Sequence, residues 1–196
     1  MRILTGERSM EGNLHMTTEP RQEPPGEEGP YARRMNRESS VSYMDCLFSV
    51  LVGSEQTDGR FGLMEMVAPK RAASPRAICT TPTTRASEGF YVLEGELTFY
   101  VGEKTYEASP GTFVFLPHGV AHSYTFETDS VRMLSIVAPG GLERHFRDPR
   151  FSEPAKGTTL PTPGEAPDPE LLEAMAADLA SYGTEVVGPP GPPREG

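Results

Sequence analysis

A run of short apolar segments separated by turn residues, spanning residues 87–126, constrains the fold of this chain most strongly. The run reads SEGFYVLEGELTFYVGEKTYEASPGTFVFLPHGVAHSYTF. Its segments at 90–94, 96–101 and 112–116 are rich in aromatic and β-branched residues, and glycine or Pro110-Gly111 separates one from the next. Aromatic and β-branched residues favour strands, whereas glycine and proline end them. The run therefore predicts consecutive antiparallel strands of a barrel or sandwich.

Similar strand-like segments flank this run on both sides. Residues 46–52, 61–67 and 76–81 precede it, and residues 130–137 follow it. An Asp58-Gly59 step between the first two of these segments is typical of a hairpin connection. About eight strands spaced over roughly 100 residues predict an all-β fold, a single small barrel.

The composition of the ends predicts four regions along the chain. Residues 1–40 are rich in proline, glycine and charge, so we expect a disordered leader there, and Met16 or Met35 is a possible start besides Met1. The barrel is expected over residues 41–140, a helical extension over 141–187 and a disordered tail over 188–196.

The predicted extension carries signals for two helices. The segment GLERHFRD indicates a short first helix. The second is predicted to start at Asp168 as its N-cap, with Pro169 in the first helical position, and to stop at Gly183. An apolar stripe at helical spacing predicts the face that packs on the barrel exterior; its residues are Leu171, Leu172, Met175, Leu179 and Tyr182.

Charge and cysteine content limit the partners and the compartment. The chain has 28 acidic against 18 basic residues and a net charge of −10, which argues against nucleic acid and anionic membranes as partners. No apolar run resembles a signal peptide or a membrane span, so we expect a cytoplasmic protein. Cys46 and Cys79 could form one disulfide, but two buried free thiols are favoured in a reducing compartment.

The spacing of a few residues in the central run resembles a known family. Glu88 stands seven residues before Gly95, and Gly111, Pro117, Gly119 and His122 follow the order glycine, five residues, proline, one residue, glycine, two residues, histidine. This pattern is similar to the two motifs of cupins. The phrases FYVLEGELTF and PGTFVFLPHGVAHSY most resemble the quercetin dioxygenase-like single-domain cupins.

The resemblance implies a fold and an assembly. Over residues 43–140 it implies the cupin double-stranded β-helix, a jelly-roll barrel, with the C-terminal helices packed outside. Cupins often associate through their barrels, and exposed strands need covering, so we expect a homodimer.

The family resemblance also implies a metal site, which this chain alters. Cupins place two histidines ahead of the glutamate of the first motif, and these residues with the second-motif histidine hold iron, nickel, copper or manganese. The corresponding positions here are Thr81 and Thr83. Threonine hydroxyls are poor ligands for these ions, so we expect no metal cofactor. The alternative is a divalent metal held by Glu88 and His122 with unexpected ligands.

Three other residues are weaker candidates for such ligands. His118 lies in a turn and is expected to face solvent, and His145 lies beyond the barrel. Cys79 lies two residues before Thr81, so in a strand the two side chains would share a face. A buried structural cysteine is nevertheless the favoured interpretation of Cys79.

Strand parity predicts what surrounds Glu88 and His122. His122 shares a face with Tyr124 and Phe126, and Glu88 shares one with Phe90 and Val92. The family resemblance implies that these faces look into the barrel. Arg132 is expected to be exposed, so its alternating neighbours Met133, Ser135 and Val137 are expected to point inward. The interior should then be apolar and aromatic around one carboxylate and one imidazole. The predicted substrate-binding residues are Thr81, Thr83, Met64, Met66, Phe90, Tyr124, Phe126 and Met133.

The pair itself has a structural and a catalytic interpretation. It can be a buried hydrogen-bonded pair without function, or a general acid and base acting on a bound organic molecule. We favour a metal-independent cyclase or isomerase of natural-product metabolism, cycloaddition included, acting on a hydrophobic polyketide-like or aromatic substrate. The alternatives are a metal-dependent quercetinase-like dioxygenase and a noncatalytic small-molecule binding protein.

Overall fold

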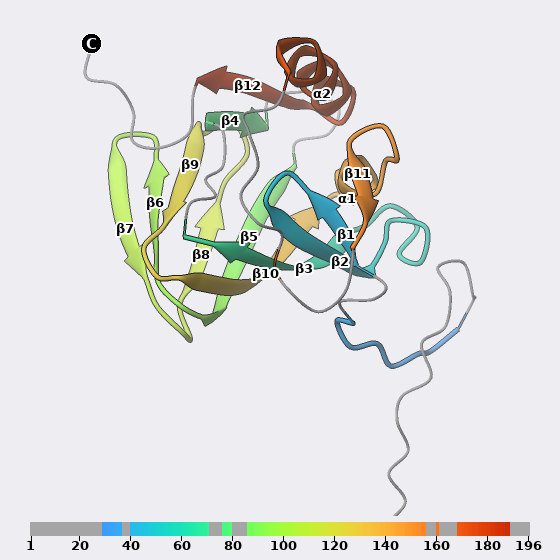
Figure 1. The fold of residues 1–196 in the computed structure, drawn as a ribbon, viewed down its shortest axis with the longest axis horizontal. Helices are drawn as coiled ribbons and strands as arrows, with labels where there is room; N and C mark the ends of the chain where they lie inside the picture. The colour runs from blue at the N-terminus through green and yellow to red at the C-terminus, as the bar shows by residue number, and fades with distance from the viewer. Residues whose placement is uncertain are drawn as a thin grey trace, which may run out of the picture.

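The computed structural model describes residues 29–36, 40–70, 76–79, 86–155, 160 and 168–188, with only the backbone at 76–79. Within these residues twelve strands form two antiparallel sheets that face each other, and two helices accompany them (Figure 1). The arrangement is the cupin-like all-β barrel that the sequence predicts, with the helices outside the sheets.

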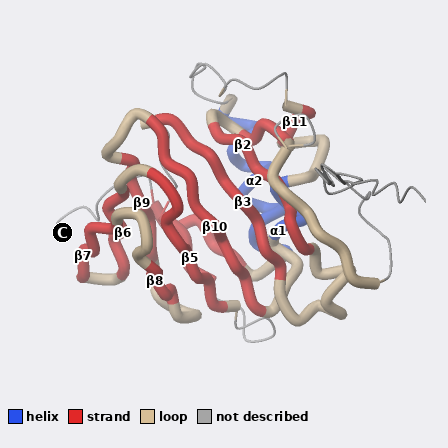
Figure 2. Tube along the Cα trace, turned by 90° about the horizontal axis from the view of Figure 1, so that it is seen from below, coloured by secondary structure: helices blue, strands red, loops and turns tan. Residues whose placement is uncertain are grey.

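The larger sheet has seven strands, and all of its pairings are antiparallel. Figure 2 shows its strands side by side, with both helices on the far side. In spatial order they are β11 (Ser152–Pro154), β1 (Val41–Tyr43), β2 (Cys46–Val52), β3 (Gly62–Pro69), β10 (Ser130–Ala138), β5 (Ser87–Glu94) and β8 (Phe113–Leu116).

The smaller sheet has five strands and lies opposite the larger one. Its order is β12 (Thr184–Gly188), β4 (Arg76–Cys79), β9 (His122–Phe126), β6 (Leu97–Val101) and β7 (Lys104–Ala108). The short helix α1 (Glu143–Phe146) and the longer helix α2 (Pro169–Ser181) lie at the end of the molecule that carries β1 and β11 (Figure 1).

Alternating burial along the strands separates the core face from the outer face. In β10, Met133 and Val137 are buried while Ile136 between them is exposed. In β5, Phe90 and Val92 are buried while Tyr91 is exposed. The side-chain period of two in a strand produces this pattern, and it confirms the inward faces expected for β5 and β10.

The strand predictions succeed where a segment has an apolar face. Residues 46–52 coincide with β2, and the other predicted strands in the described residues shift by a few positions at their ends. The sequence did not predict β1, β7 or β11. In β7 the side chains of residues 104–107 are all exposed, so this strand forms by pairing with β6 and has no apolar face to reveal it.

Helix α2 starts as its sequence predicts. The Asp168 carboxylate accepts a hydrogen bond from the Glu170 amide at 3.0 Å, and Gly183 follows the helix with φ at 81°. The predicted apolar stripe is partly wrong. Met175 and Leu179 are buried, but Leu171 and Leu172 are exposed, because only the C-terminal half of the helix packs on the protein.

A hydrogen bond connects the predicted leader to the larger sheet. Residues 29–36 fall within the predicted leader, and there the Tyr31 hydroxyl donates to the Leu51 carbonyl in β2 at 2.8 Å. No helix among the described residues is long and apolar enough to span a membrane. The four predicted regional boundaries stay predictions.

A buried carboxylate ties α1 to the larger sheet and leads to a stability prediction. Glu143 is fully buried and accepts hydrogen bonds from the Ser54 amide at 2.6 Å and the Gly141 amide at 2.7 Å. An added Cβ at Gly62 would collide with this carboxylate. Because Glu143 cannot move without losing both bonds, Gly62→Ala is expected to lower the free energy of unfolding by about 1–3 kcal/mol in urea titrations. An unchanged midpoint would show that the carboxylate can move aside.

Candidate functional site

Glu88 and His122 come from opposite sheets and meet in the interior. Glu88 lies in β5 between Leu116 of β8 and Val137 of β10, and His122 begins β9 of the smaller sheet, opposite Val101. The His122 Nε2 atom is 3.8 Å from the Glu88 Oε1 atom, and both residues are less than 10% exposed, at 6% and 8%. The structure thus brings together the two residues that the sequence singled out.

The backbone next to His122 determines which ring nitrogen faces Glu88. Nδ1 lies 3.1 Å from the Val120 carbonyl oxygen, which can only accept, so Nδ1 carries a proton and donates it. In the neutral ring Nε2 is then unprotonated and directed at the carboxyl group. A single proton placed on either Nε2 or Glu88 makes their contact attractive, and this arrangement suits a group that gives and takes protons.

Aromatic rings and methionines make up much of the buried core between the sheets that carry this pair. The Phe99 ring lies 5.5 Å from the Phe90 ring and 5.4 Å from the Tyr124 ring, and Tyr124 is 5.5 Å from Phe126. Burial raises the pKa of the Tyr124 phenol, and the nearby Cys46 and Glu88 raise it further, so its hydroxyl stays protonated. Three buried methionines belong to the same apolar core: Met64, Met66 and Met133.

The predicted substrate-binding residues divide into two groups. Phe90, Phe126 and the three methionines are buried in the core, and the partly buried Tyr124 packs against it, so these residues share the interior with Glu88. Thr81 and Thr83 lie outside the described residues. The catalytic and binding roles assigned to all these residues stay predictions.

Among the described residues, the donor atoms near Glu88 are too few for a divalent metal site. Glu88 and His122 supply one carboxylate and one imidazole, and the family positions for two more imidazoles hold threonine. Among the described residues, no three histidine, cysteine, aspartate or glutamate side chains could hold a metal ion together. His118 is exposed on its turn, as expected.

The two cysteines contribute no ligand that the structure can place. Cys46 is a free thiol packed against the core, and burial raises its pKa to about 12. A thiol with so high a pKa is protonated at neutral pH and is a poor metal ligand. The side chain of Cys79 lies outside the described part of the chain.

Comparison with known proteins shows which family the central segment resembles. The family model for the cupin domain matches residues 66–137, which span β3 to β10 and include both Glu88 and His122. Residues 66–137 thus form a cupin domain within this chain. The chain is 26% identical over 137 residues to quercetin 2,3-dioxygenase of Bacillus subtilis (strain 168), a match that covers 70% of this chain and 39% of that protein. It therefore spans about two fifths of the length of this relative.

Solved structures similar to this chain include proteins of different kinds. The polyketide cyclase RemF from Streptomyces resistomycificus is 20% identical, with a TM-score of 0.45, over 55% of this chain and 79% of RemF. The cupin domain of Schizosaccharomyces pombe Cnp3 is also 20% identical, with a TM-score of 0.42, over 53% of this chain and 67% of that domain.

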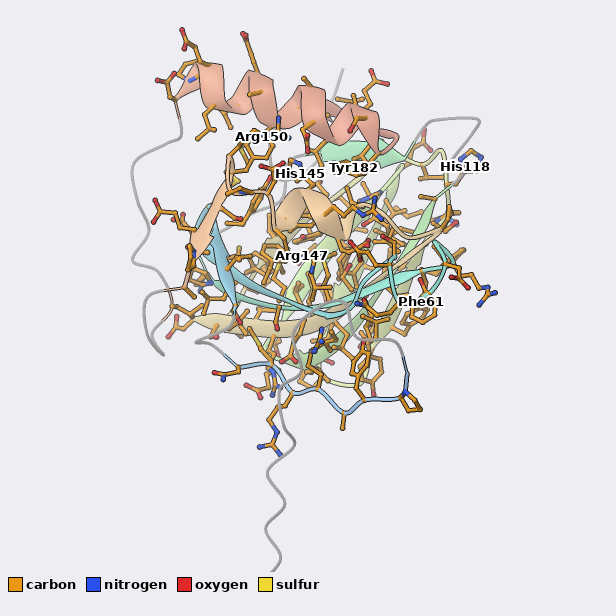
Figure 3. The ribbon with its side chains drawn as sticks, turned by 90° about the vertical axis from the view of Figure 1, so that its right-hand side faces the viewer. Phe61, His118, His145, Arg147, Arg150 and Tyr182 are labelled. Atoms are coloured by element: carbon orange, nitrogen blue, oxygen red, sulfur yellow. The ribbon has the colours of Figure 1, made fainter. Side chains whose placement is uncertain are left out.

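A second buried polar cluster, which the sequence did not predict, lies where α1 and α2 meet β1. His145 of α1 is fully buried, with Nδ1 at 2.7 Å from the Asp178 Oδ2 atom of α2 and Nε2 at 2.9 Å from the Tyr43 hydroxyl of β1. Figure 3 shows His145 and Arg150 close below α2, with His118 well apart from them. From the sequence, His145 is expected to lie beyond the barrel, and its only predicted role is that of a weak candidate for a metal ligand. No local spacing joins its partners, because they come from three distant segments.

The buried groups beside α1 make the stability of the cupin depend on pH. Burial lowers the pKa of His145 below its usual 6.5, despite the opposing effect of Asp178. In Glu143 and Asp178 burial alone would raise the pKa, but hydrogen bonds, from Ser54 and Gly141 in one case and from His145 and Arg150 in the other, lower it.

The expected result is a loss of stability on acidification in two stages. Below about pH 6.5 the unfolded chain takes up a proton at His145 before the folded protein does, so the free energy of unfolding falls. Below about pH 4.5 the same argument applies to Glu143 and Asp178, whose pKa values are lower in the folded protein than in the unfolded chain. Their stabilising effect is fully present above the pKa of the unfolded chain and is lost as the pH falls through the pKa of the folded protein. Urea titrations between about pH 7.5 and 2.5 measure both stages. In His145→Gln the first stage should be absent, and a first stage of unchanged size would contradict its assignment to His145.

Proposed function

We propose that this cupin is a metal-independent cyclase or isomerase that acts on a hydrophobic aromatic or polyketide-like substrate between its two sheets. The observation that carries the proposal is the buried Glu88–His122 pair, in which Nε2 faces the carboxyl group across an apolar interior. A carboxylate and an imidazole with one proton between them can transfer protons without a cofactor. The lining of rings and methionines suits a flat, apolar molecule.

The chemistry expected of the pair is an intramolecular condensation. Glu88 removes a proton from a carbon next to a carbonyl group, and the resulting enolate carbon forms a bond to a second carbonyl carbon of the same molecule. The alkoxide oxygen takes a proton from the His122 imidazolium, so the ring closes without an oxidant or a reductant. The aromatic lining contributes by holding a flexible chain with its reacting carbons close together.

A metal-dependent dioxygenase is the alternative that a specific observation favours. The supporting observation is the sequence identity to quercetin 2,3-dioxygenase, which is named for an aromatic substrate. The donor set around Glu88 and His122 argues against this alternative for the present chain. The noncatalytic binding protein, the homodimer, the role in natural-product metabolism and the cytoplasmic location stay predictions, and sedimentation equilibrium would test the homodimer.

The proposed cyclase or isomerase and the alternative dioxygenase would form products of different mass. We would incubate the protein, treated with a chelator and kept without dioxygen, with a panel of poly-β-keto thioesters and of partly cyclised aromatic ketones. The proposal expects a product of unchanged mass or one that has lost water, as detected by mass spectrometry. A product that has gained two oxygen atoms, formed only with dioxygen and a restored metal, would overturn it in favour of the dioxygenase. Tight binding without conversion of any compound would favour the binding protein.

A further inference from the structure

The Tyr43–His145–Asp178 chain has a defined direction of hydrogen bonding. A hydrogen-bonded carboxylate whose pKa is lowered, as in Asp178, can only accept, so the His145 Nδ1–H group donates to it across 2.7 Å. The opposite nitrogen, Nε2, then has a lone pair and accepts the hydroxyl proton of Tyr43 across 2.9 Å. The Tyr43 oxygen keeps its own lone pairs, so it is left as a hydrogen-bond acceptor.

Charged residues hold the outer end of this chain in place. The Arg150 guanidinium contacts Asp178 at 2.5 Å and also binds both carboxylate oxygens of Asp148. Asp178 is therefore fixed by one cation and one imidazole at the same time. Since His145 is fully buried against it, the ring has little freedom, and the orientation of the Tyr43 hydroxyl is set from the surface inward.

The other end of this hydrogen-bonded chain packs into the apolar core between the sheets. The Tyr43 ring packs edge-on against Phe48, at 5.7 Å between centroids, and Phe48 stands opposite Met66, which stands opposite Met133 across β3 and β10. Tyr43 is 8% exposed and belongs to the same core as these residues. Burial raises the pKa of the Tyr43 phenol, with smaller effects from Cys46 and Asp178, so the hydroxyl stays neutral.

We propose that Tyr43 is a second binding residue of the interior, whose oxygen accepts a hydrogen bond from a hydroxyl group on an aromatic ligand. His145 and Asp178 act through it as positioning residues. The inference rests on the proposed function and narrows its substrate class to hydroxylated aromatic compounds. A purely structural tie between α1, α2 and β1 would hold the elements together without making the interior distinguish a ligand hydroxyl from a methyl group.

Two probes of almost equal shape test this distinction, 2-naphthol and 2-methylnaphthalene. Their dissociation constants would be measured by fluorescence for the wild-type protein and for Tyr43→Phe, Asp178→Asn and Tyr106→Phe, the last being an exposed tyrosine on β7 that serves as the matched control. In the wild type and the control we expect 2-naphthol to bind about five to ten times more tightly, the ratio that one net hydrogen bond provides. Tyr43→Phe should remove this preference and leave the affinity for 2-methylnaphthalene unchanged. Asp178→Asn should reduce the preference for 2-naphthol. The variant that carries both Tyr43→Phe and Asp178→Asn should resemble Tyr43→Phe alone.

Each remaining outcome counts against a specific part of the inference. Equal affinity of the two probes for the wild type, or an unchanged preference in Tyr43→Phe, would overturn the role of Tyr43 while leaving the Glu88–His122 proposal intact. Equal weakening of both probes in Tyr43→Phe would assign the residue to structure alone. If neither probe binds the wild type, the interior does not accept aromatic molecules, and both the inference and the proposed substrate class fail.

Discussion

Glu88→Gln is expected to lower turnover by a factor of about 10² to 10⁴, the range that a positioned general acid or base contributes. Glutamine keeps the shape of the side chain and fills the same space between Leu116 and Val137, so the fold should persist. The amide cannot take up a proton, however, and its oxygen or nitrogen would face the His122 Nε2 atom in place of a carboxylate. The loss should fall mainly on kcat, with KM little changed.

The partner residue and a control make this expectation specific. His122→Asn should cause a loss of similar size, and the double variant should be no slower than the slower single variant, because two residues that act together in the same condensation step do not contribute independently. Glu65→Gln is a suitable control, since Glu65 is a buried carboxylate on β3 that is paired with Arg132 and is not part of the proposed machinery. Full turnover in Glu88→Gln would show that the interior acts by shape alone.

The part of the site that the sequence predicted depends on rules that operate over short distances. Glu88 precedes a glycine turn, and His122 follows one, so spacing along single strands was enough to single out both residues and the neighbours that share their faces. The alternation of Phe90 and Val92 with Tyr91 follows from the same strand period. The resemblance to the cupin motifs then supplied the long-range fact, that these faces look into the barrel.

The parts that the sequence missed depend on contacts between distant segments. Tyr43, His145 and Asp178 each follow ordinary local patterns, and only the packing of α1 and α2 against β1 brings them into one hydrogen-bonded chain. The exposure of Leu172 has a similar origin, because a helical stripe shows which residues share a face and not how much of that face is covered. Burial and polar pairing across elements are properties of the assembled fold.

Phe99→Ala is expected to lower the free energy of unfolding by about 3–5 kcal/mol, the usual cost of removing a fully buried phenylalanine ring. Phe99 is completely buried in β6, and its ring touches Phe90 of the opposite sheet and Tyr124 of the neighbouring strand. It is therefore packed between the two strands that carry the candidate site. A cavity there removes contacts from both sheets at once, and the neighbouring backbone can close it only in part.

The exposed Phe115 of β8 supplies a control with the same chemical change. Its ring is 60% exposed on the outer face of the larger sheet, so Phe115→Ala should cost less than about 1 kcal/mol in the same urea titrations. If Phe99→Ala leaves too little folded protein to measure, Phe99→Leu should still fold, with a loss of about 1–2 kcal/mol. Phe90 is two residues from Glu88 and Tyr124 is two residues from His122, so Phe99→Leu should also reduce turnover while the folded fraction stays high. Equal stability losses in the Phe99 and Phe115 variants would mean that the two sheets are not held together by a packed aromatic core, and the placement of Glu88 opposite His122 would then lose its physical basis.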